Sequence, residues 1–378
     1  MAVVTSSRVY PKGIHGRNAR IDRLQVNAYQ IPTDFPESDG TLEWTKTILV
    51  LVQLTSGDIE GLGYTYADQA TARLIETHLA EQIVGHDPMA LPQIWEQMVS
   101  SVRNMGRWGI AAMAISAVDI ALWDLKAKLL GQPLALLLGV YRDQVPVYGS
   151  GGFTSYSIPR LRDQLSDWAR SGIQRVKMKV GRDPVADPKR VRAAREAIGS
   201  KVELFVDANG AYTRKQALAE AQCFAEEGVS WFEEPVPATD LEGLRLFRDR
   251  APAGMDCVAG EYGYALPDFR NLLCAGAVDV LQADVTRCGG ITGFLKVGAL
   301  CDAYQIPFSS HCAPSLHVAL GCALPSLRHL EYFHDHVRIE HMLFSGVASP
   351  VEGMLSPDLR QPGLGLVFKQ EAAAPFAI

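Results

Sequence analysis

The chain has 378 residues, of which 48% are hydrophobic and 21% charged, and 36 Lys+Arg against 42 Asp+Glu give a net charge of −6. This is the composition of a globular protein of about two or three domains, and it excludes collagen, coiled-coil and disordered chains. There is no basic excess to neutralise phosphates, so nucleic acid is not an expected partner.

The sequence predicts neither a secretory signal nor a membrane span. Met1–Asn18 has no apolar core followed by a cleavage site. Ile48–Leu54 is too short to cross a bilayer, and Ile110–Leu125 carries Asp119 and Asp124. The seven cysteines include no CxxC pair and are odd in number, which is typical of a reducing compartment. We therefore expect a cytoplasmic protein.

The first part of the chain predicts strands followed by helices without alternation. The strands are Ile21–Tyr29, Thr47–Leu54 and Ile59–Tyr66, and the helices are Thr71–Val84, Pro92–Val102 and Ile110–Leu130. A turn at Thr55–Asp58 joins the second and third strands as a hairpin. This order indicates an α+β domain over residues 1–140.

From Val145 onward, eight short apolar strands alternate with amphipathic helices. The strands are Val145–Tyr148, Arg175–Val180, Val202–Val206, Ser230–Phe232, Cys257–Ala259, Val278–Gln282, Ile306–Ser309 and His329–Tyr332. Repeated strand–helix units predict a parallel sheet, and eight of them favour a closed barrel over residues 141–350. The alternative is a doubly wound open sheet, but no Gly-rich dinucleotide loop follows the first strands. We expect residues 351–378 to pack on the N-terminal domain.

Ionisable residues follow the strand period of the predicted barrel, at the carboxyl ends where reactive groups collect. They are Lys177, Lys179, Asp207, Glu233, Glu261, Asp284, His311 and Glu331. Three hard carboxylates from successive strands, Asp207, Glu233 and Glu261, suit a divalent cation such as Mg²⁺. The alternative is that these carboxylates cap helices or pair with arginines. Spacing does not decide whether Glu233 or Glu234 points inward, because strand alternation allows only one.

Lys177-Met178-Lys179 places two ammonium groups on one face of a strand. If that face lines the barrel, repulsion between them and a nearby cation lowers a lysine pKa and frees an amine to act as a base. The alternative is a solvated basic strand end. Likewise, Asp284 and His311 end neighbouring strands, so the carboxylate can fix the imidazole tautomer. Alone, such a histidine is more often a core or loop residue.

Other candidates for chemistry are weaker. His334-Asp335-His336 resembles a metal-binding pair but lacks a well-placed third ligand, so we expect the two histidines to lie at the surface or in a pocket wall. Cys312 beside His311 is a conceivable nucleophile, which the carboxylates make unnecessary. Glu331, if protonated, could donate a hydrogen bond to an enolate oxygen, or it could instead form a salt bridge. Trp231 is expected to be core.

These motifs, in this order, resemble the enolase superfamily, specifically the mandelate racemase-like group (the mandelate racemase/muconate lactonizing enzyme family). The resemblance covers nearly the whole chain. It rests on Ala117–Lys128 with Gly131-Gln132-Pro133-Leu134, Val206–Gly210, Phe232–Pro235, the lysine pair, Gln282-Ala283-Asp284 with Gly289-Gly290, Ser309-Ser310-His311 and Leu330-Glu331-Tyr332. It implies an α/β fold, a modified (β/α)8 TIM barrel of (β/α)7β type with an N-terminal α+β capping domain completed by the C-terminal tail.

The resemblance also implies roles for the site residues. The metal ligands would be Asp207, Glu233 and Glu261, holding one Mg²⁺ per subunit. The opposed bases would be Lys179 and His311, with Asp284 as the partner of His311. Lys177 would contact a substrate carboxylate and lower the pKa of Lys179, and Glu331 would hydrogen-bond an enolate. Further substrate contacts are expected at Asn209, Trp44 and Arg17, the last two in capping-domain loops.

The implied chemistry is abstraction of the proton next to a carboxylate, which forms an enediolate. We expect a Mg²⁺-dependent dehydratase of a sugar acid that eliminates the β-hydroxyl to give a 2-keto-3-deoxy acid. A racemase or epimerase of a 2-hydroxy acid is the runner-up, and a cycloisomerase ranks below it because such relatives usually lack the His–Asp pair. A barrel that binds an acid sugar without turnover is the alternative from a different class. The expected partner is a small carboxylate, and the resemblance implies a homo-oligomer.

Overall fold

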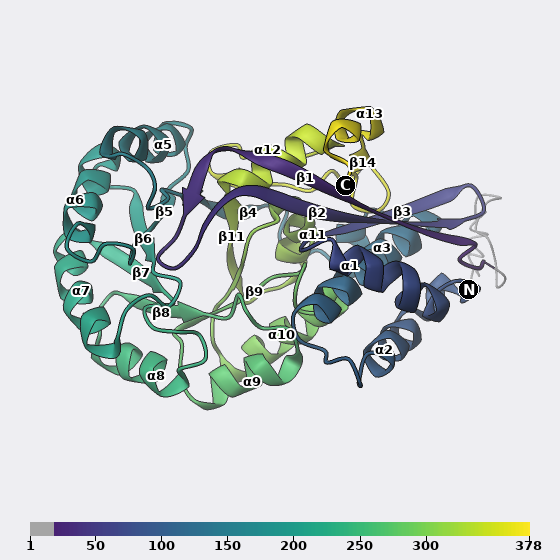
Figure 1. Ribbon diagram of the computed structural model, residues 1–378, viewed down its shortest axis with the longest axis horizontal. Helices are drawn as coiled ribbons and strands as arrows, with labels where there is room; N and C mark the ends of the chain where they lie inside the picture. Colours follow the sequence, from purple (N-terminus) through teal and green to yellow (C-terminus); the bar gives the residue numbers. More distant parts are fainter. Residues whose placement is uncertain (1–18) are drawn as a thin grey trace, which may run out of the picture.

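The computed structural model describes residues 19–378, so Arg17 lies outside the described residues. The chain folds into a parallel barrel with a separate antiparallel sheet beside it (Figure 1). That sheet has the order β1 (Arg23–Ser38), β2 (Glu43–Ser56) and β3 (Ile59–Tyr66). The predicted hairpin turn joins β2 to β3, and its Gly57 has φ +57, a conformation that glycine adopts without strain.

The first two strands are longer than the sequence predicted. The predicted strands end at Tyr29 and begin again at Thr47, but the two strands continue as a paired ribbon beyond a register shift between Pro32 and Glu37. A proline has no N–H to donate, so the ladder breaks there and resumes afterwards. The ribbon carries the end of the hairpin away from its own sheet and over the barrel (Figure 1).

Helices follow the antiparallel sheet in the chain, and α1 and α3 pack on it. They are α1 (Ala70–Leu74), the π-turn η1 (Ile75–Leu79), the 3-10 turns η2 (Ala80–Gln82) and η3 (Pro88–Ala90), α2 (Leu91–Ser101), α3 (Ile110–Leu129) and α4 (Leu134–Leu138). The predicted helix Thr71–Val84 is thus divided into α-, π- and 3-10 segments. Helix α3 packs so closely against β3 that a Cβ at Gly63 would lie 2.3 Å from the Ala117 carbonyl oxygen.

The second unit is a closed barrel of eight parallel strands, as predicted. They are β4 (Val145–Gly151), β5 (Arg175–Lys179), β6 (Glu203–Asp207), β7 (Val229–Glu233), β8 (Asp256–Ala259), β9 (Val280–Ala283), β10 (Phe308–Ser310) and β11 (Leu327–Phe333). The pairing of Glu331 with Tyr148 between β11 and β4 closes it. A cluster of buried residues fills the interior: Tyr148, Phe205, Trp231, Val258 and Val280. The barrel is therefore a packed core rather than a pore.

A helix follows each barrel strand. They are α5 (Ile158–Arg170), α6 (Asp187–Ile198), α7 (Arg214–Glu226), α8 (Leu241–Arg250), α9 (Leu266–Cys274), α10 (Gly290–Tyr304), α11 (Pro314–Ala323) and α12 (His334–Leu343). Their starts carry recognisable signals, such as the capping box of Thr213 and Gln216 at α7. Among the described residues, no helix is both long and apolar enough to cross a bilayer. Each of the seven cysteines is a free thiol.

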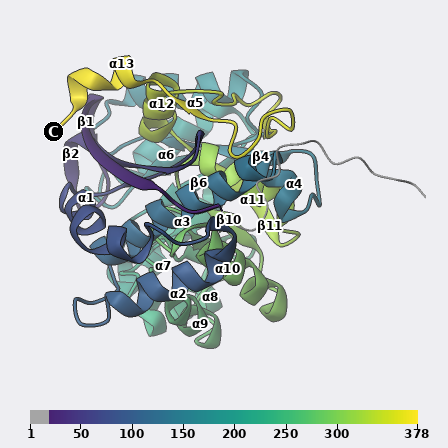
Figure 2. The same ribbon diagram turned by 90° about the vertical axis from the view of Figure 1, so that its right-hand side faces the viewer.

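The C-terminal segment touches both units. It contains β12 (Phe344–Ser345), β13 (Met354–Leu355), β14 (Val367–Phe368), α13 (Gln370–Ala373) and η4 (Ala374–Phe376). Strand β13 pairs with β4 of the barrel. The Ile378 N–H donates to Ala28 O of β1, and Figure 2 shows this end of the chain beside the capping sheet. The domain boundaries at residues 140 and 350 stay predictions.

The capping hairpin lies against the carboxyl ends of the barrel strands. The Thr154 N–H, after β4, donates to Ser38 O at 2.8 Å. Gly40 approaches the loop after β6 so closely that a Cβ would lie 2.4 Å from Ala208 O. The capping unit therefore covers the end of the barrel where the predicted reactive residues lie.

Candidate active site

The ionisable residues predicted at the strand ends are all buried at this covered end of the barrel. Five of them lie within strands β5, β6, β7 and β11: Lys177, Lys179, Asp207, Glu233 and Glu331. Asp284 and His311 directly follow β9 and β10, and Glu261 lies two residues after the end of β8. Because neighbouring parallel strands are paired, these residues lie at a similar height along the barrel axis, as the pairing of Asp207 with Glu233 illustrates. Seven strands thus contribute to one site.

Asp207, Glu233 and Glu261 can hold a divalent cation together. Each offers one carboxylate oxygen, and these atoms lie within 4.8 Å of one another. Glu261 Oε2 is buried without a hydrogen-bond donor, and its ion-pair neighbour is His311 Nε2 at 3.2 Å. Oxygen ligands on buried carboxylates, one of them unsatisfied, are the donor set that Mg²⁺ prefers, so the residues present fit that ion.

The choice between Glu233 and Glu234 is decided by strand geometry. The Glu233 carboxylate faces the barrel interior, where it accepts hydrogen bonds from Lys177 Nζ at 2.5 Å and Gln282 Nε2 at 3.0 Å. Glu234 follows the strand end at φ +40 and is also buried, with Oε1 unpartnered. Burial, together with the neighbouring carboxylates of Glu261 and Asp207, raises the pKa of Glu234 well above its usual value. Only Glu233 belongs to the three-carboxylate cluster.

Both lysines of β5 point into the carboxylate cluster rather than into solvent. Lys177 Nζ lies 2.5 Å from Glu233, 2.8 Å from Glu331 and 3.5 Å from Asp207. Lys179 Nζ donates to Asp207 Oδ2 at 2.5 Å and to Asn209 Oδ1 at 3.1 Å. The solvated alternative for this strand end is therefore wrong.

The expected direction of the Lys179 pKa is also wrong for this structure. Burial lowers the pKa of Lys179, and the charge of Lys177 lowers it further. The carboxylate of Asp207, helped by Glu261 and Glu233, outweighs both and raises the pKa above its usual value. A divalent cation on the same carboxylates would oppose this shift, because it would compete for their negative charge.

His311 and Asp284 form the predicted pair. The bond between His311 Nδ1 and Asp284 Oδ2 is 2.8 Å, which leaves Nε2 facing the carboxylates. Asp284 stays ionised: although burial raises its pKa, the bond to His311 and its charge hold the pKa well below the usual range. Burial lowers the pKa of His311, but the carboxylates of Glu261 and Glu331 outweigh it and raise the pKa well above the usual value.

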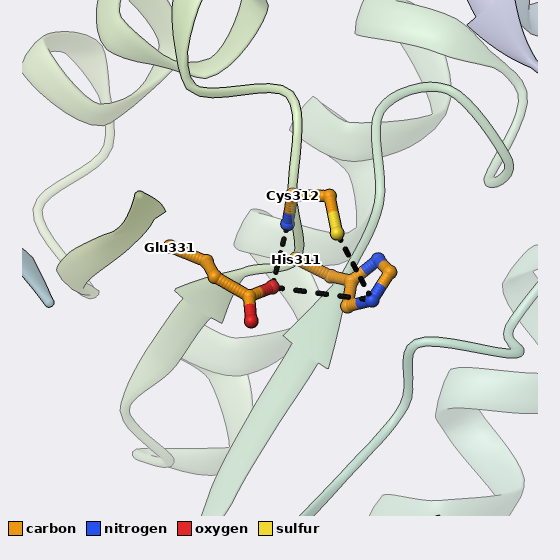
Figure 3. Close-up of side chains that lie close together, drawn as sticks. All are labelled: His311, Cys312 and Glu331. Atoms are coloured by element: carbon orange, nitrogen blue, oxygen red, sulfur yellow. Dashed lines mark hydrogen bonds and ion pairs between the residues drawn. The ribbon is translucent and has the colours of Figure 1, made fainter. Parts of the chain in front are cut away.

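Figure 3 shows how Cys312 and Glu331 approach His311. Cys312 Sγ lies 3.3 Å from His311 Nε2, but burial raises the pKa of this thiol to about 12, so it is not a thiolate nucleophile near neutral pH. Glu331 accepts bonds from the Cys312 N–H at 2.7 Å and from Ser150 Oγ at 2.6 Å. Burial raises the pKa of Glu331, yet Lys177 and His311 outweigh it and hold the pKa well below the usual range. These contacts favour the ionised form, and the alternative of a salt bridge is the one found, with Lys177 as the partner of Glu331.

Lys179 and His311 stand on opposite sides of the barrel. Strands β6 to β9 separate their strands in one direction, and β4 and β11 in the other. The three-carboxylate cluster, on the first of these arcs, lies between them. A small acid bound at the carboxylates would therefore meet a proton-handling group on each face.

Comparisons with known proteins show the family of the chain. Residues 30–139 match the family model "Mandelate racemase / muconate lactonizing enzyme, N-terminal domain", and residues 160–372 match "Enolase C-terminal domain-like". The chain belongs to the enolase superfamily. Within the superfamily it falls in the mandelate racemase/muconate lactonizing enzyme group, as the sequence motifs predicted.

Three relatives within this superfamily are informative. The 3,6-anhydro-alpha-L-galactonate cycloisomerase of Streptomyces coelicolor is 35% identical over 95% of this chain and 99% of its own. The L-talarate/galactarate dehydratase of Salmonella typhimurium is 32% identical over 96% of this chain and 94% of its own. A structure of that dehydratase, liganded with Mg and L-lyxarohydroxamate, has a TM-score of 0.87, with 29% identity over 100% of this chain and 96% of that one.

The third relative is a mandelate racemase/muconate lactonizing enzyme-like protein from Rubrobacter xylanophilus. Its crystal structure matches with a TM-score of 0.93 and 57% identity, covering 95% of this chain and 100% of that one. The chain therefore shares a fold with superfamily members of known structure, and its curated relatives are sugar-acid dehydratases and cycloisomerases.

Three residues that the sequence analysis gave no role in the site contact its carboxylates. Trp231, expected only as core, donates its indole N–H to Glu233 Oε2 at 2.9 Å. Gln282 donates to the same oxygen. The Arg287 guanidinium lies 3.6 Å from Asp284 and 3.9 Å from Glu261. The sequence did hold a signal for Arg287, because it lies three residues after the strand-end Asp284.

Of the further substrate contacts that the resemblance implied, Asn209 and Trp44 lie within the described residues. Asn209, in the loop after β6, does lie in the site beside Lys179. Trp44 is fixed within the capping hairpin, where it packs on Phe153 and donates Nε1 to Glu37 at 2.9 Å. Burial, helped by the charge of Asp335, raises the pKa of Glu37 to about 9. The hairpin thus carries a buried acid beside Trp44.

The two histidines after β11 diverge. His334 pairs with Asp34 of β1, whereas His336 stacks on Tyr66 with ring centroids 3.4 Å apart. Burial lowers the pKa of His336 to about 3, so its ring is neutral. Tyr66, the last residue of β3, has a buried hydroxyl with no hydrogen-bond partner. His334 and His336 therefore do not bind one ion together.

Proposed function

We propose that the chain is a Mg²⁺-dependent dehydratase of a sugar acid of the aldonate or aldarate type. The observation that supports this best is the placement of Lys179 and of the His311–Asp284 pair on opposite sides of Asp207, Glu233 and Glu261. The resemblance to the Salmonella dehydratase supports the substrate class. The ligand of that relative's structure is an acid-sugar analogue, bound with Mg.

Each group has a role in the proposed reaction. Mg²⁺ held by Asp207, Glu233 and Glu261 would supply positive charge against the substrate carboxylate, whose negative charge grows when the α-proton leaves. Lys179, as the neutral amine, takes the α-proton to form the enediolate. Lys177 stabilises the developing charge from the same face of β5.

His311 acts on the other face of the substrate. In its protonated form the ring can give a proton to the leaving β-hydroxyl, which departs as water. Asp284 holds the ring by Nδ1, so the proton is delivered from Nε2. The enol product then tautomerises to a 2-keto-3-deoxy acid. Dehydration thus uses both opposed groups once in each turnover.

A second candidate is a cycloisomerase of an acid sugar, which the similarity to the Streptomyces enzyme favours. The two opposed bases also support racemisation or epimerisation of a 2-hydroxy acid. These reactions differ in their products: dehydration releases water, whereas cycloisomerisation and racemisation conserve the mass of the substrate.

The test is a screen of purified protein with Mg²⁺ against a panel of aldonates, aldarates and their lactones. We expect loss of water by mass spectrometry and a 2-keto acid that reacts with semicarbazide. The same incubation in D₂O identifies racemisation as deuterated, inverted substrate without water loss, and nuclear magnetic resonance detects a ring change. Binding without any of these products would overturn the proposal.

His311→Asn sharpens this test, because it removes the proposed acid but leaves Lys179 in place. We expect this variant to lose keto-acid formation while still exchanging the α-proton of the substrate in D₂O. Normal dehydration by His311→Asn would show that another group expels the hydroxyl.

A further inference from the structure

A second group of metal-binding atoms lies where the capping hairpin meets the barrel. Asp34 and Glu37 are on β1, and His334 is the first residue of α12, so 300 residues separate His334 from Asp34. One donor atom of each side chain lies within 4.8 Å of the others. This group shares no residue with the carboxylate cluster of the candidate active site.

Glu37 is the most unusual member of this group. Its side chain is fully buried, and Oε2 accepts a hydrogen bond from Trp44 Nε1, but Oε1 has no hydrogen-bond partner. Leaving a buried carboxylate oxygen unpaired is costly, and such atoms are rare in folded proteins. A hydrogen-bond donor or a cation beside Oε1 would remove that cost.

The nearby cationic side chains are engaged elsewhere. Within residues 19–378, no Lys, Arg or His nitrogen lies within ion-pair distance of Glu37. Arg338 pairs with Asp335 at 2.6 Å. The Arg160 guanidinium lies 3.7 Å from Asp34 and over the rings of Phe35 and Tyr156. None of these cationic side chains therefore approaches the unpaired Glu37 oxygen.

The donor set indicates the kind of cation. His334 directs Nε2 at the Asp34 carboxylate, 3.1 and 3.2 Å from its two oxygens. One imidazole nitrogen with two carboxylate oxygens suits a divalent transition metal such as Mn²⁺ or Zn²⁺, whereas Mg²⁺ prefers oxygen ligands alone. Asp34 and His334 are partly exposed, so an ion can enter and keep water ligands.

We propose that Asp34, Glu37 and His334 form a second divalent-cation site, for a transition metal ion, that joins the capping hairpin to α12. Two ligands come from the hairpin and one from the helix after the last barrel strand. The same hairpin places Ser38 against Thr154 and Gly40 against Ala208 O, over the carboxyl end of the barrel. An ion bound here would hold the hairpin in this covering position.

The test is a titration of the chelator-stripped full-length protein with Mn²⁺. Electron paramagnetic resonance measures the free Mn²⁺, and the number of bound ions follows by difference from the total. Mn²⁺ is the probe because thiolates bind it weakly, and Cys223 and Cys274 are exposed. We expect wild type to bind two ions, and His334→Ala and Glu37→Gln to lose one, with affinity at that site reduced at least about tenfold.

Matched variants separate the two sites. Asp207→Asn should lose the ion of the candidate active site and keep the second one, so the two proposals fail independently. Glu43→Gln, on the same hairpin but exposed, should bind as wild type does. Arg160→Gln removes a competing positive charge beside Asp34 and should tighten the second site.

Thermal unfolding gives an independent readout. Mn²⁺ should raise the melting temperature of Asp207→Asn but not that of the double variant Asp207→Asn, His334→Ala. One ion on wild type that Asp207→Asn no longer binds, or two ions on both His334→Ala and Glu37→Gln with unchanged affinity, would overturn the second site.

Discussion

His311 and Asp284 follow neighbouring strands and are joined by a hydrogen bond of 2.8 Å between Nδ1 and Oδ2. The second Asp284 oxygen accepts bonds from the N–H and hydroxyl of Thr286, each at 2.7 Å. The carboxylate is therefore fixed from both sides. This arrangement selects the imidazole nitrogen that faces the carboxylate cluster.

Asp284→Asn should lower kcat by about two to four orders of magnitude with little change in KM. The amide is nearly the same size, so the fold should persist, but its NH₂ can donate to Nδ1 and stabilise the wrong tautomer. Steady-state kinetics on the best substrate of the screen measures the effect. Thr286→Val, which removes one bond to the carboxylate, should cost far less, and kcat within about threefold of wild type for Asp284→Asn would contradict this role.

Asp207→Asn should abolish turnover at every Mg²⁺ concentration. The substitution removes one anionic ligand of the proposed ion and also the partner of Lys179 Nζ. Activity is followed against Mg²⁺ concentration for the variant and for Glu203→Gln, which lies at the opposite end of the same strand in a surface ion pair. Glu203→Gln should behave as wild type, whereas near-normal turnover of Asp207→Asn would count against the cluster as the metal site.

Trp231→Phe should weaken activation by Mg²⁺ about tenfold while leaving the barrel folded. The indole N–H holds Glu233 Oε2 at 2.9 Å, and phenylalanine keeps the aromatic packing on Phe205 but has no donor. The measurement is the Mg²⁺ concentration for half-maximal activity, with the melting temperature as a check on packing. A lowered melting temperature with unchanged Mg²⁺ activation would mean that Trp231 acts only as core.

The barrel was predictable because its strands are short, apolar and regularly spaced, and because strand ends converge in a closed parallel sheet. That geometry brings Asp207, Glu233 and Glu261 together, although the spacing alone left Glu234 as an alternative. The capping hairpin was not predictable in the same way. Its prolines break the strand pattern, and the pairing beyond Pro32 depends on the barrel surface beneath it.

The pKa shifts in the site could not be predicted from the sequence either. A KxK pattern shows that two lysines share a face, and repulsion then predicts a lowered pKa. It does not show that Asp207 lies 2.5 Å from Lys179 Nζ, which reverses the direction. In the same way, nothing adjacent in sequence connects Tyr66 with His336, or Trp231 with the metal-ligand role proposed for Glu233. Such contacts follow from packing between distant segments.

Glu340→Gln should change how stability depends on pH. Glu340 is buried on α12, and burial raises its pKa to about 7, although the Tyr64 and Ser315 hydroxyls donate to it. A carboxyl group with a raised folded-state pKa stabilises the fold fully below its unfolded pKa, and this contribution is lost as pH rises through about 7. Glutamine cannot ionise, so the variant escapes that loss, which is on the order of 3 kcal/mol.

The measurement is the difference in melting temperature between Glu340→Gln and wild type at pH 5.5 and pH 8.5. The variant should be the less stable protein at pH 5.5, because its amide nitrogen cannot accept one of the two hydroxyl bonds. Its relative stability should improve by a few degrees at pH 8.5, where wild type must keep a buried charge. Glu371→Gln, an exposed change, should give the same difference at both values. A pH-independent difference for Glu340→Gln would mean that Glu340 titrates alike in the folded and unfolded chain.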